Sequence, residues 1–271
     1  MADFEGVDPS LYEDPATVAA YGPGGGLQPP EAAILRRIEP EVRGGRVLDI
    51  GVGSGRTVGP LRDLASEYVG IDYSDAMLAV GRRVHPGVDL RLGDVRDLAD
   101  FESGSFRLVV FSFNGIDSIS HEDRFVALRE IRRVVEDGGL FVFSTHNEAY
   151  QPSFRKLWFD GLDIGHDPLR SPIRLLRAVP RLARRLRNHL RHRGQQTKAD
   201  GYSIVCDGGF DHTALCYTIG RDAQVDQLTA TGFATEAVYD LAGEEAAPGC
   251  TDQWLTYVVR AVGSGPAPMV G

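Results

Sequence analysis

The stretch Arg46-Val-Leu-Asp-Ile-Gly-Val-Gly-Ser-Gly-Arg-Thr57 decides the fold of this chain. It begins with the apolar run Val47-Leu-Asp-Ile50, which is typical of a strand buried on both faces of a parallel sheet. Three glycines, Gly51, Gly53 and Gly55, then alternate with small residues. Glycine admits a positive φ and has no Cβ, so the backbone of this turn can approach a ligand closely. A helix after the turn would direct its free N–H groups toward the same ligand.

The glycine spacing and the acid before it distinguish this turn from a dinucleotide site. The order is Gly-x-Gly-x-Gly, whereas nicotinamide dinucleotide sites use Gly-x-Gly-x-x-Gly. Asp49 stands two residues before the first glycine, where a negative charge would repel a phosphate. A carboxylate there suits a cationic or hydrogen-bond-donating ligand. The stretch resembles the first motif of the class I S-adenosylmethionine-dependent methyltransferases.

Further strands follow at regular intervals, and each ends in a polar residue. The expected strands cover residues 46–50, 67–72, 88–92, 106–113 and 140–144. The polar residues at or just after their ends are Asp49, Asp72, Asp94, Asn114 and Asn147. Helices are expected over residues 57–65 and 121–135, the second one closed by Asp137-Gly-Gly139. This order predicts a mostly parallel sheet whose ligands bind at the carboxyl ends of the strands.

The end of the chain matches the way in which the resembling family closes its sheet. A helix at 221–231 precedes strands at 234–239 and 254–262, and the family places its last, antiparallel strand between two neighbours. The fold class is therefore α/β: a doubly wound, mostly parallel seven-stranded sheet of the Rossmann-like methyltransferase type, with a helical insertion after the fifth strand. The expected divisions are a lead-in or cap (1–30), a cofactor-binding core (31–147), a basic helical insertion (148–210), the rest of the sheet (211–262) and a disordered tail (263–271).

The donor site is expected at the glycine turn. An acid at the end of the second strand, here Asp72, sits beside the first turn of such a sheet and can accept both hydroxyls of a ribose. Tyr73 and Met77 follow it and can pack on a purine. The resemblance implies S-adenosyl-L-methionine as cofactor and S-adenosyl-L-homocysteine as product. The cofactor-binding residues that result are Asp49, Gly51, Gly53, Gly55, Asp72, Tyr73, Met77, Gly93, Asp94, Val95, Ser112 and Phe113.

The acceptor side is less explicit in the sequence. Methyl transfer from a sulfonium is an in-line displacement that needs alignment and exclusion of water but neither a metal nor a covalent nucleophile. A base is required only when the acceptor must lose a proton, and the catalytic candidates are His212, His146 and Asp117. The substrate-binding candidates are Tyr12, Tyr21, Asn114 and Asn147.

Composition limits where the protein works. The chain has 271 residues, of which 42% are hydrophobic and 25% charged, as in ordinary soluble domains. Its first residues lack the apolar core of a signal peptide, and it contains no apolar run long enough to span a bilayer. The three cysteines are scattered and fit neither a disulfide framework nor a metal site. We therefore expect a cytoplasmic protein without a membrane partner, and the sequence leaves a homodimer open.

Charge is distributed unevenly along the chain. Residues 168–199 contain nine arginines, one lysine and no acid. Because the net charge of the whole chain is −9, the rest carries about −19. The basic segment is interpreted either as a solvated amphipathic helix whose leucine stripe lies on the core, or as a lid over the acceptor, a docking face for an acidic partner, or an RNA contact.

The leading hypothesis is a methyltransferase that acts on an oxygen or nitrogen of a small-molecule acceptor. An RNA methyltransferase that uses the arginine segment is the second hypothesis, but the acidic remainder of the chain argues against a nucleic acid partner. A nicotinamide-dependent oxidoreductase is disfavoured by the glycine spacing. A non-catalytic cofactor-binding protein is the fourth alternative.

Overall fold

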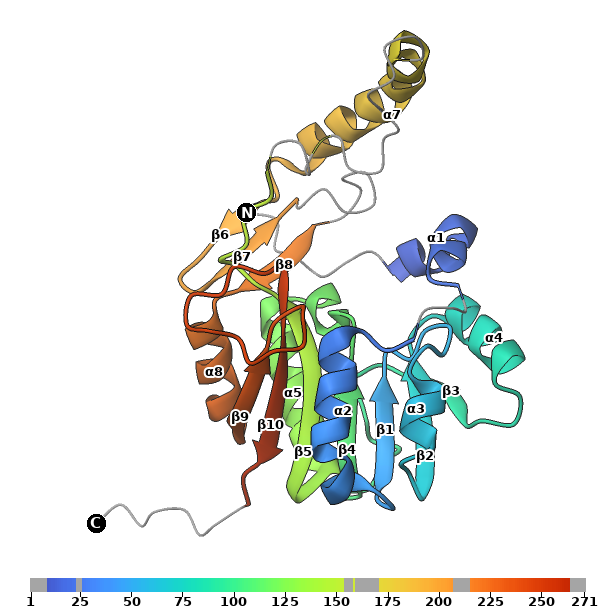
Figure 1. The fold of residues 1–271 in the computed structure, drawn as a ribbon, viewed down its shortest axis with the longest axis vertical. Helices are drawn as coiled ribbons and strands as arrows, with labels where there is room; N and C mark the ends of the chain where they lie inside the picture. The colour runs from blue at the N-terminus through green and yellow to red at the C-terminus, as the bar shows by residue number, and fades with distance from the viewer. Residues whose placement is uncertain (1–8, 23–25, 154–157, 159–170, 207–214, 264–271) are drawn as a thin grey trace.

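The computed structural model describes residues 9–22, 26–153, 158, 171–206 and 215–263. Its centre is a seven-stranded sheet in the order β3-β2-β1-β4-β5-β10-β9 (Figure 1). The strands are β1 (Arg46–Ile50), β2 (Glu67–Asp72), β3 (Leu90–Leu92), β4 (Phe106–Phe111), β5 (Val135–His146), β9 (Phe233–Tyr239) and β10 (Trp254–Ala261). β10 runs antiparallel to both of its neighbours, β5 and β9, whereas the other neighbouring strands of this sheet are parallel. This is the expected methyltransferase sheet, with the antiparallel strand in the expected place.

Helices cover both faces of the sheet because its central strands are apolar on both sides. Along β4, Leu108 packs in one buried cluster and the next residue, Val109, in another, since successive side chains of a strand point to opposite faces. The first cluster includes residues of α2 (Pro29–Val42), α3 (Val58–Arg62) and α4 (Asp75–Val84). The second includes residues of α5 (His121–Val134) and α8 (Arg221–Ala230).

The junction between α5 and β5 differs from the sequence-based expectation. We expected Asp137-Gly-Gly139 to end the helix, but α5 ends at Val134 and β5 begins at Val135. Pairing with β4 explains the difference. Phe106 is opposite Val135, whereas Leu108 is already opposite Leu140, so the extra residues, including Gly138 at φ +79°, form an irregularity inside the strand. The pairing register, which is tertiary, decides this boundary.

The chain between β5 and α8 contains a second sheet as well as the expected helix, and the last strand of this sheet lies in the stretch 211–262, which was expected to belong to the main sheet. The helix is α7 (Ser171–His192). The antiparallel strands β6 (Thr197–Lys198), β7 (Tyr202–Val205) and β8 (Cys216–Ile219) follow it. One of the interpretations left open for this helix placed its leucine stripe on the core. Of the described members of that stripe, Leu182 is half-buried, whereas Val179, Leu186 and Leu190 are exposed. The buried side chains of α7 include Ala178 and Arg185 instead.

The N-terminal segment crosses the carboxyl edge of the main sheet. It contains a 3-10 helix, η1 (Pro9–Tyr12), and a short helix, α1 (Pro15–Ala20) (Figure 1). The Ser54 hydroxyl of the glycine turn donates to the Tyr21 carbonyl. The Ser74 hydroxyl donates to the Tyr12 carbonyl over 3.0 Å. Two contacts thus attach this segment to the loops that follow β1 and β2.

Candidate active site

A cleft of about 430 Å³ lies at the carboxyl ends of β1, β2 and β4. Ten of the predicted cofactor residues line it, namely Gly51, Gly53, Asp72, Tyr73, Met77, Gly93, Asp94, Val95, Ser112 and Phe113. Tyr12 and Tyr21 of the N-terminal segment line it as well. The cleft therefore brings together the predicted donor residues and half of the predicted substrate-binding residues.

The glycine turn adopts a backbone that other residues rarely can. Gly51, Gly53 and Gly55 have φ values of +66°, +55° and +93°, which is the left-handed region where a Cβ is strained. A Cβ on Gly55 would also lie 2.5 Å from Cδ2 of His85. The His85 Nε2 atom is 2.8 Å from the Gly55 carbonyl oxygen. Gly55 thus packs against α4's end and does not line the cleft, whereas Gly51 and Gly53 do.

Asp72 ties the glycine turn to the second strand. One carboxylate oxygen accepts the Gly53 N–H at 2.8 Å and the other accepts the Ser74 N–H at 2.9 Å. Burial raises the pKa of Asp72, and these backbone donors oppose the rise. Each oxygen has further acceptor capacity, so the carboxylate that fixes the loop can also receive hydroxyl groups from a ligand.

Asp49 lies behind the turn and does not line the cleft. Its side chain is fully buried, and its Oδ2 atom accepts the Thr57 hydroxyl at 2.5 Å and the Tyr68 hydroxyl at 2.8 Å. The Oδ1 atom has no hydrogen-bond partner among the described residues. Burial raises the pKa of Asp49 to about 6, although both hydroxyl donors oppose this. Asp49 therefore anchors the start of the following helix from beneath the loop.

Asp94 is engaged by a neighbouring arginine. The Arg96 guanidinium approaches Asp94 to 2.6 Å and Asp123 to 2.8 Å. Partial burial disfavours the Asp94 carboxylate, but the Arg96 hydrogen bonds prevail and lower its pKa. The acid is ionised at neutral pH, and Arg96 lines the cleft beside it.

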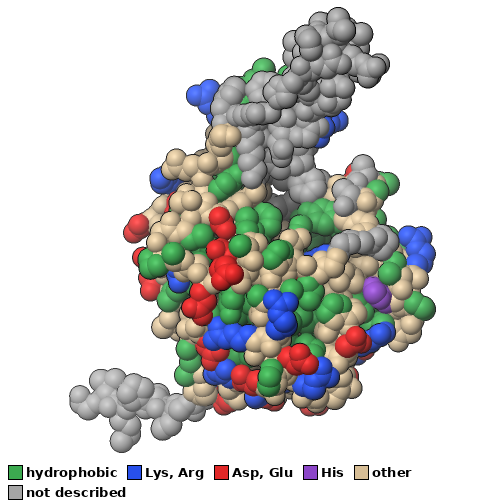
Figure 2. Space-filling model, in the orientation of Figure 1, with side chains coloured by type: hydrophobic (Ala, Val, Ile, Leu, Met, Phe, Trp, Pro, Cys, Tyr) green, Lys and Arg blue, Asp and Glu red, His purple; other side chains and the backbone are tan. Residues whose placement is uncertain are grey.

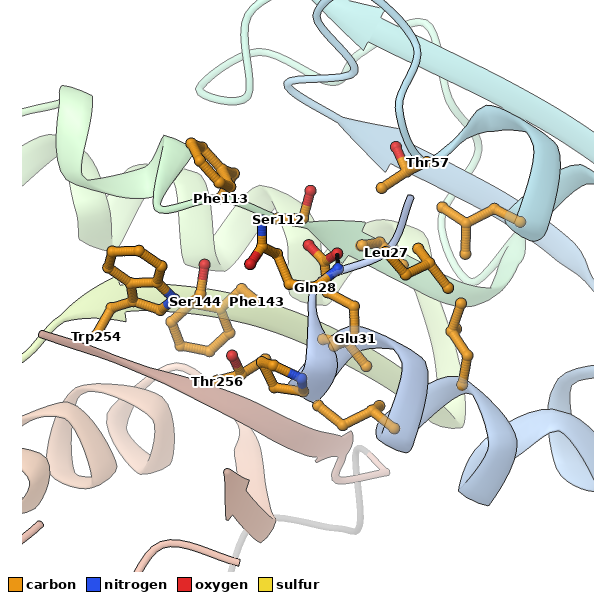
Figure 3. Close-up of a pocket in the computed structure, with 16 residues that line it drawn as sticks. Leu27, Gln28, Glu31, Thr57, Ser112, Phe113, Phe143, Ser144, Trp254 and Thr256 are labelled. Atoms are coloured by element: carbon orange, nitrogen blue, oxygen red, sulfur yellow. Dashed lines mark hydrogen bonds between the residues drawn. The ribbon is translucent and has the colours of Figure 1, made fainter. Parts of the chain in front are cut away.

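Arg56 supplies positive charge to the opposite part of the cleft. Its guanidinium contacts both carboxylate oxygens of Glu31, at 2.5 and 2.7 Å, and lies 3.3 Å from the Ser112 hydroxyl. Burial opposes its charge, yet the Glu31 contacts raise its pKa. Glu31 also accepts the backbone N–H of Gln28 at 2.7 Å. Both residues line a second, mostly apolar pocket together with Trp254 (Figure 3).

The loop after β4 has an unusual conformation. Phe113 and Asn114 have φ values of +55° and +60°, the only positive values among described residues other than glycine. Such strain concentrates at functional sites. The Asn114 N–H donates to the Ser144 hydroxyl at 2.8 Å. This turn directs Phe113 into the cleft, while the Asn114 side chain is buried next to it and does not line it.

Two predicted catalytic residues form a pair. Asp117 lies in the 3-10 helix η2 (Gly115–Ser118), and His146 lies at the end of β5. One Asp117 oxygen accepts the His146 N–H at 2.7 Å and is 2.8 Å from the ring nitrogen Nδ1. The other Asp117 oxygen accepts from Arg124 at 2.7 Å and from the Thr145 hydroxyl at 2.6 Å. The buried carboxylate thus fixes the orientation of the imidazole.

Aromatic rings link the cleft to the Asp117–His146 pair, neither member of which lines the cleft. Neighbouring ring centroids are 5.8 to 6.2 Å apart along one series, within the range for aromatic pairs. The series runs through Tyr73, Tyr12, Tyr21, Phe113, Trp254 and His146. It begins next to the Asp72 carboxylate and ends at the Asp117–His146 pair.

The remaining predicted residues lie elsewhere. The Asn147 amide donates to the carbonyls of Cys250 and Asp252, at 2.8 and 3.1 Å, and does not line the cleft. His212 lies outside the described residues. The cleft also contains residues that sequence reasoning did not select, such as Ser118 and Ile119. The sequence predicts Trp254 only as the first residue of a strand, whereas in the structure its ring contacts Phe113. None of these belongs to a recognisable motif, so only their place in the fold reveals them.

Comparison with known sequences agrees with this geometry. Residues 47–139 match a family described as a methyltransferase domain. A demethylmenaquinone methyltransferase of Renibacterium salmoninarum is 32% identical over 144 residues, which are 53% of this chain and 54% of that protein. A probable S-adenosylmethionine-dependent methyltransferase of Mycolicibacterium smegmatis is 32% identical over 114 residues, 42% of this chain and 43% of the other. The chain thus spans about half the length of these curated relatives.

Solved structures show the same fold. The CcbJ methyltransferase of Streptomyces caelestis has a TM-score of 0.57 and 19% identity, covering 94% of this chain and 100% of that one. A 1,6-didemethyltoxoflavin-N1-methyltransferase of Burkholderia thailandensis, solved with 1,6-didemethyltoxoflavin and S-adenosylhomocysteine, has a TM-score of 0.56 and 12% identity, covering 94% and 85%. At these identities the likeness concerns the fold alone.

Proposed function

We propose that this chain, which carries a class I S-adenosylmethionine-dependent methyltransferase domain, transfers the methyl group of that cofactor to an oxygen or nitrogen of a small organic acceptor. The observation that carries the proposal is the Asp72 carboxylate. It holds the Gly53 N–H and the Ser74 N–H in a cleft that also contains Met77 and Val95. This arrangement provides acceptors for a ribose diol beside apolar contacts for a purine.

The charges in the cleft suit a zwitterionic donor. Arg56, held by Glu31 and facing Ser112 and Phe113, can receive the carboxylate of the methionine part. The ionised Asp94 can accept the adenine amino group when Arg96 shifts between its two carboxylate partners. The left-handed glycine backbone leaves room for close approach of the ligand. When bound, S-adenosylmethionine supplies an activated methyl group on a sulfonium.

The aromatic series and the Asp117–His146 pair suit the acceptor. Tyr12, Tyr21 and Phe113 offer apolar ring surfaces that exclude water from the cleft. With the Nδ1 proton of His146 donated to Asp117, the basic nitrogen of the imidazole is Nε2, which can take the proton of a hydroxyl or amine. The proposal of a small organic acceptor is in line with the names of one curated relative and one protein of the same fold, which refer to demethylmenaquinone and 1,6-didemethyltoxoflavin.

Calorimetric titration of the full chain tests the donor assignment. S-adenosylmethionine should bind, whereas NAD should not. Replacing Asp72 with alanine removes two charge-assisted acceptors, each worth about 1.5–3 kcal/mol, and should weaken cofactor binding at least about tenfold. Asp75→Ala is the matched control, because this neighbouring acid is exposed and does not line the cleft. Absence of S-adenosylmethionine binding would sink the proposal.

Transfer is tested separately from binding. The chain should convert S-adenosylmethionine to S-adenosylhomocysteine when it is incubated with a panel of phenols, amines and heteroaromatic compounds, and mass spectrometry should find one of them heavier by a methyl group. Cofactor binding without product from any acceptor class, including short RNA, would support a non-catalytic role instead.

A further inference from the structure

Helix α7 carries a surface that the methyltransferase site does not use. It is 22 residues long, about 33 Å at 1.5 Å per residue, and it projects from the body beyond the second sheet (Figure 1). None of its described residues lines the cleft. Residues 178–192, the part of α7 whose side chains the structure describes, contain no Phe, Tyr, Trp, Asp or Glu.

Two adjacent stripes run along this helix. The inner stripe consists of Ala178, Leu182, Arg185 and His189, which recur at helical spacing and are buried or half-buried. Arg185 is 4% exposed and donates to the Trp158 carbonyl at 2.6 Å. The ring of His189 lies against Trp158. This stripe therefore faces the protein.

The outer stripe consists of Val179, Ala183, Leu186 and Leu190, one position further along at each turn. Val179, Leu186 and Leu190 are 51%, 50% and 56% exposed, and Ala183 is exposed as well. Singly exposed apolar residues are normal, but a stripe of them along one helix marks an interaction surface. Arg187 and Arg191, both exposed, follow this stripe around the helix.

We propose that the outer stripe of α7, with its flanking arginines, binds the surface of an anionic lipid bilayer. A helix with an apolar face and arginines beside it lies in the headgroup region, with its leucines inserted and its arginine side chains reaching the lipid phosphates. No helix in the described ranges is long and apolar enough to cross a bilayer.

Charge complementarity selects this occupant and its orientation. Residues 168–199 carry +10, whereas the remainder of the chain carries about −19. An anionic surface attracts the segment and repels the body, which fixes α7 as the contacting element. In Figure 2, basic side chains flank the projecting segment, whereas the body shows acidic side chains together with basic ones. RNA would pair with the arginines but leave Leu186 and Leu190 in water.

Co-sedimentation of the full chain with vesicles tests the proposal. We expect binding to vesicles of phosphatidylglycerol and phosphatidylcholine in equal parts, and binding at least about tenfold weaker to phosphatidylcholine alone. Leu186→Gln with Leu190→Gln, and separately Arg187→Glu with Arg191→Glu, should each weaken binding to the anionic vesicles about tenfold or more. Thermal unfolding should show that both double variants remain folded, since the replaced side chains are exposed.

Matched controls lie in α4 and in β3, the strand at the edge of the main sheet. Arg83→Glu and Leu92→Gln replace exposed side chains of the same types and should leave vesicle binding unchanged. Three outcomes would overturn the proposal: no binding of the wild type to anionic vesicles, unchanged binding of the leucine double variant, or binding of single-stranded RNA or an acidic polypeptide in the absence of vesicle binding.

Discussion

At the scale of single residues, Asp49 shows how a motif position can support a cleft without lining it. The sequence placed it at the donor, and the structure places it beneath the turn, between the Thr57 and Tyr68 hydroxyls. A sequence pattern reports that an acid is needed there. Whether its carboxylate faces the cleft or the core depends on how the following helix packs.

Asp49 leads to a prediction about stability and pH. Its pKa rises from 3.8 to about 6 on folding, so between these values the folded state holds a proton that the unfolded state has released. The free energy of unfolding therefore falls as pH rises through this window, by about 3 kcal/mol at about 1.36 kcal/mol per pH unit. Urea unfolding of the wild type and Asp49→Asn between pH 4 and 7 measures the difference. Parallel curves for the two proteins would contradict the assignment.

His146 is the second residue with a testable role. Replacing it with glutamine should lower kcat by about 10²–10⁴-fold for an acceptor that must lose a proton, while cofactor affinity is unchanged. The kcat of the variant should recover at high pH, where the acceptor ionises unaided, and a merely structural role would not produce this recovery. His192→Gln is the control, because His192 lies at the end of α7, contacts Gln195 and does not line the cleft. Full activity of the His146 variant at neutral pH would remove the base from the mechanism.

At the scale of elements, the glycine turn combines backbone strain with close packing. Gly55 and Gly87 have φ values of +93° and +81°. Of the two, only Gly55 has a neighbour within 4 Å of the position that a Cβ would occupy, the nearest being the His85 ring. Alanine at either site should cost about 1–2 kcal/mol for the left-handed backbone. Gly55→Ala should cost more, and it should weaken S-adenosylmethionine binding. Thermal unfolding measures the stability of both variants, and calorimetry measures their cofactor affinity. Equal losses of stability in the two variants would mean that the His85 contact does not contribute.

Sequence patterns located most elements but not their registers. The bounds of β2 agree with the expected 67–72, because its apolar residues stand between clear breaks. The start of β5 did not follow its glycines, since pairing with β4 decides it. On α7, helical spacing identified a stripe but could not say which of two adjacent stripes faces the body. The helical periodicity of a sequence shows which side chains lie on the same face. Which face is buried depends on the element that packs against the helix.

At the scale of the whole molecule, Arg124 joins parts that are distant in sequence. Its side chain is fully buried and contacts Asp117 of η2 and Gln224 of α8, at 2.7 Å each. It also lies 4.3 Å from the centre of the Tyr217 ring in the second sheet. The Asp117–His146 pair is therefore held by the same cation that links the main sheet to the insertion.

Removing this cation should affect the entire chain. Arg124→Met leaves Asp117 buried without its main partner, and breaking a buried pair in this way costs about 3–5 kcal/mol. Arg129→Met, on the exposed side of the same helix, should stay within about 0.5 kcal/mol of the wild type. Urea unfolding compares the two variants, and similar stabilities would show that the buried cation is dispensable.

The sequence by itself determined the sheet, the donor motif and the acid at the end of β2, because these rest on short runs whose periodicity and spacing are local. The role of the insertion, a homodimer and the part played by His212 stay predictions. Only the tertiary structure decided that Asp117 and His146, 29 residues apart, form a pair, that Asp49 supports the turn from below, and that Leu186 and Leu190 of α7 face outward. These facts depend on which elements pack against each other, and contacts between distant segments produce no local pattern in the sequence.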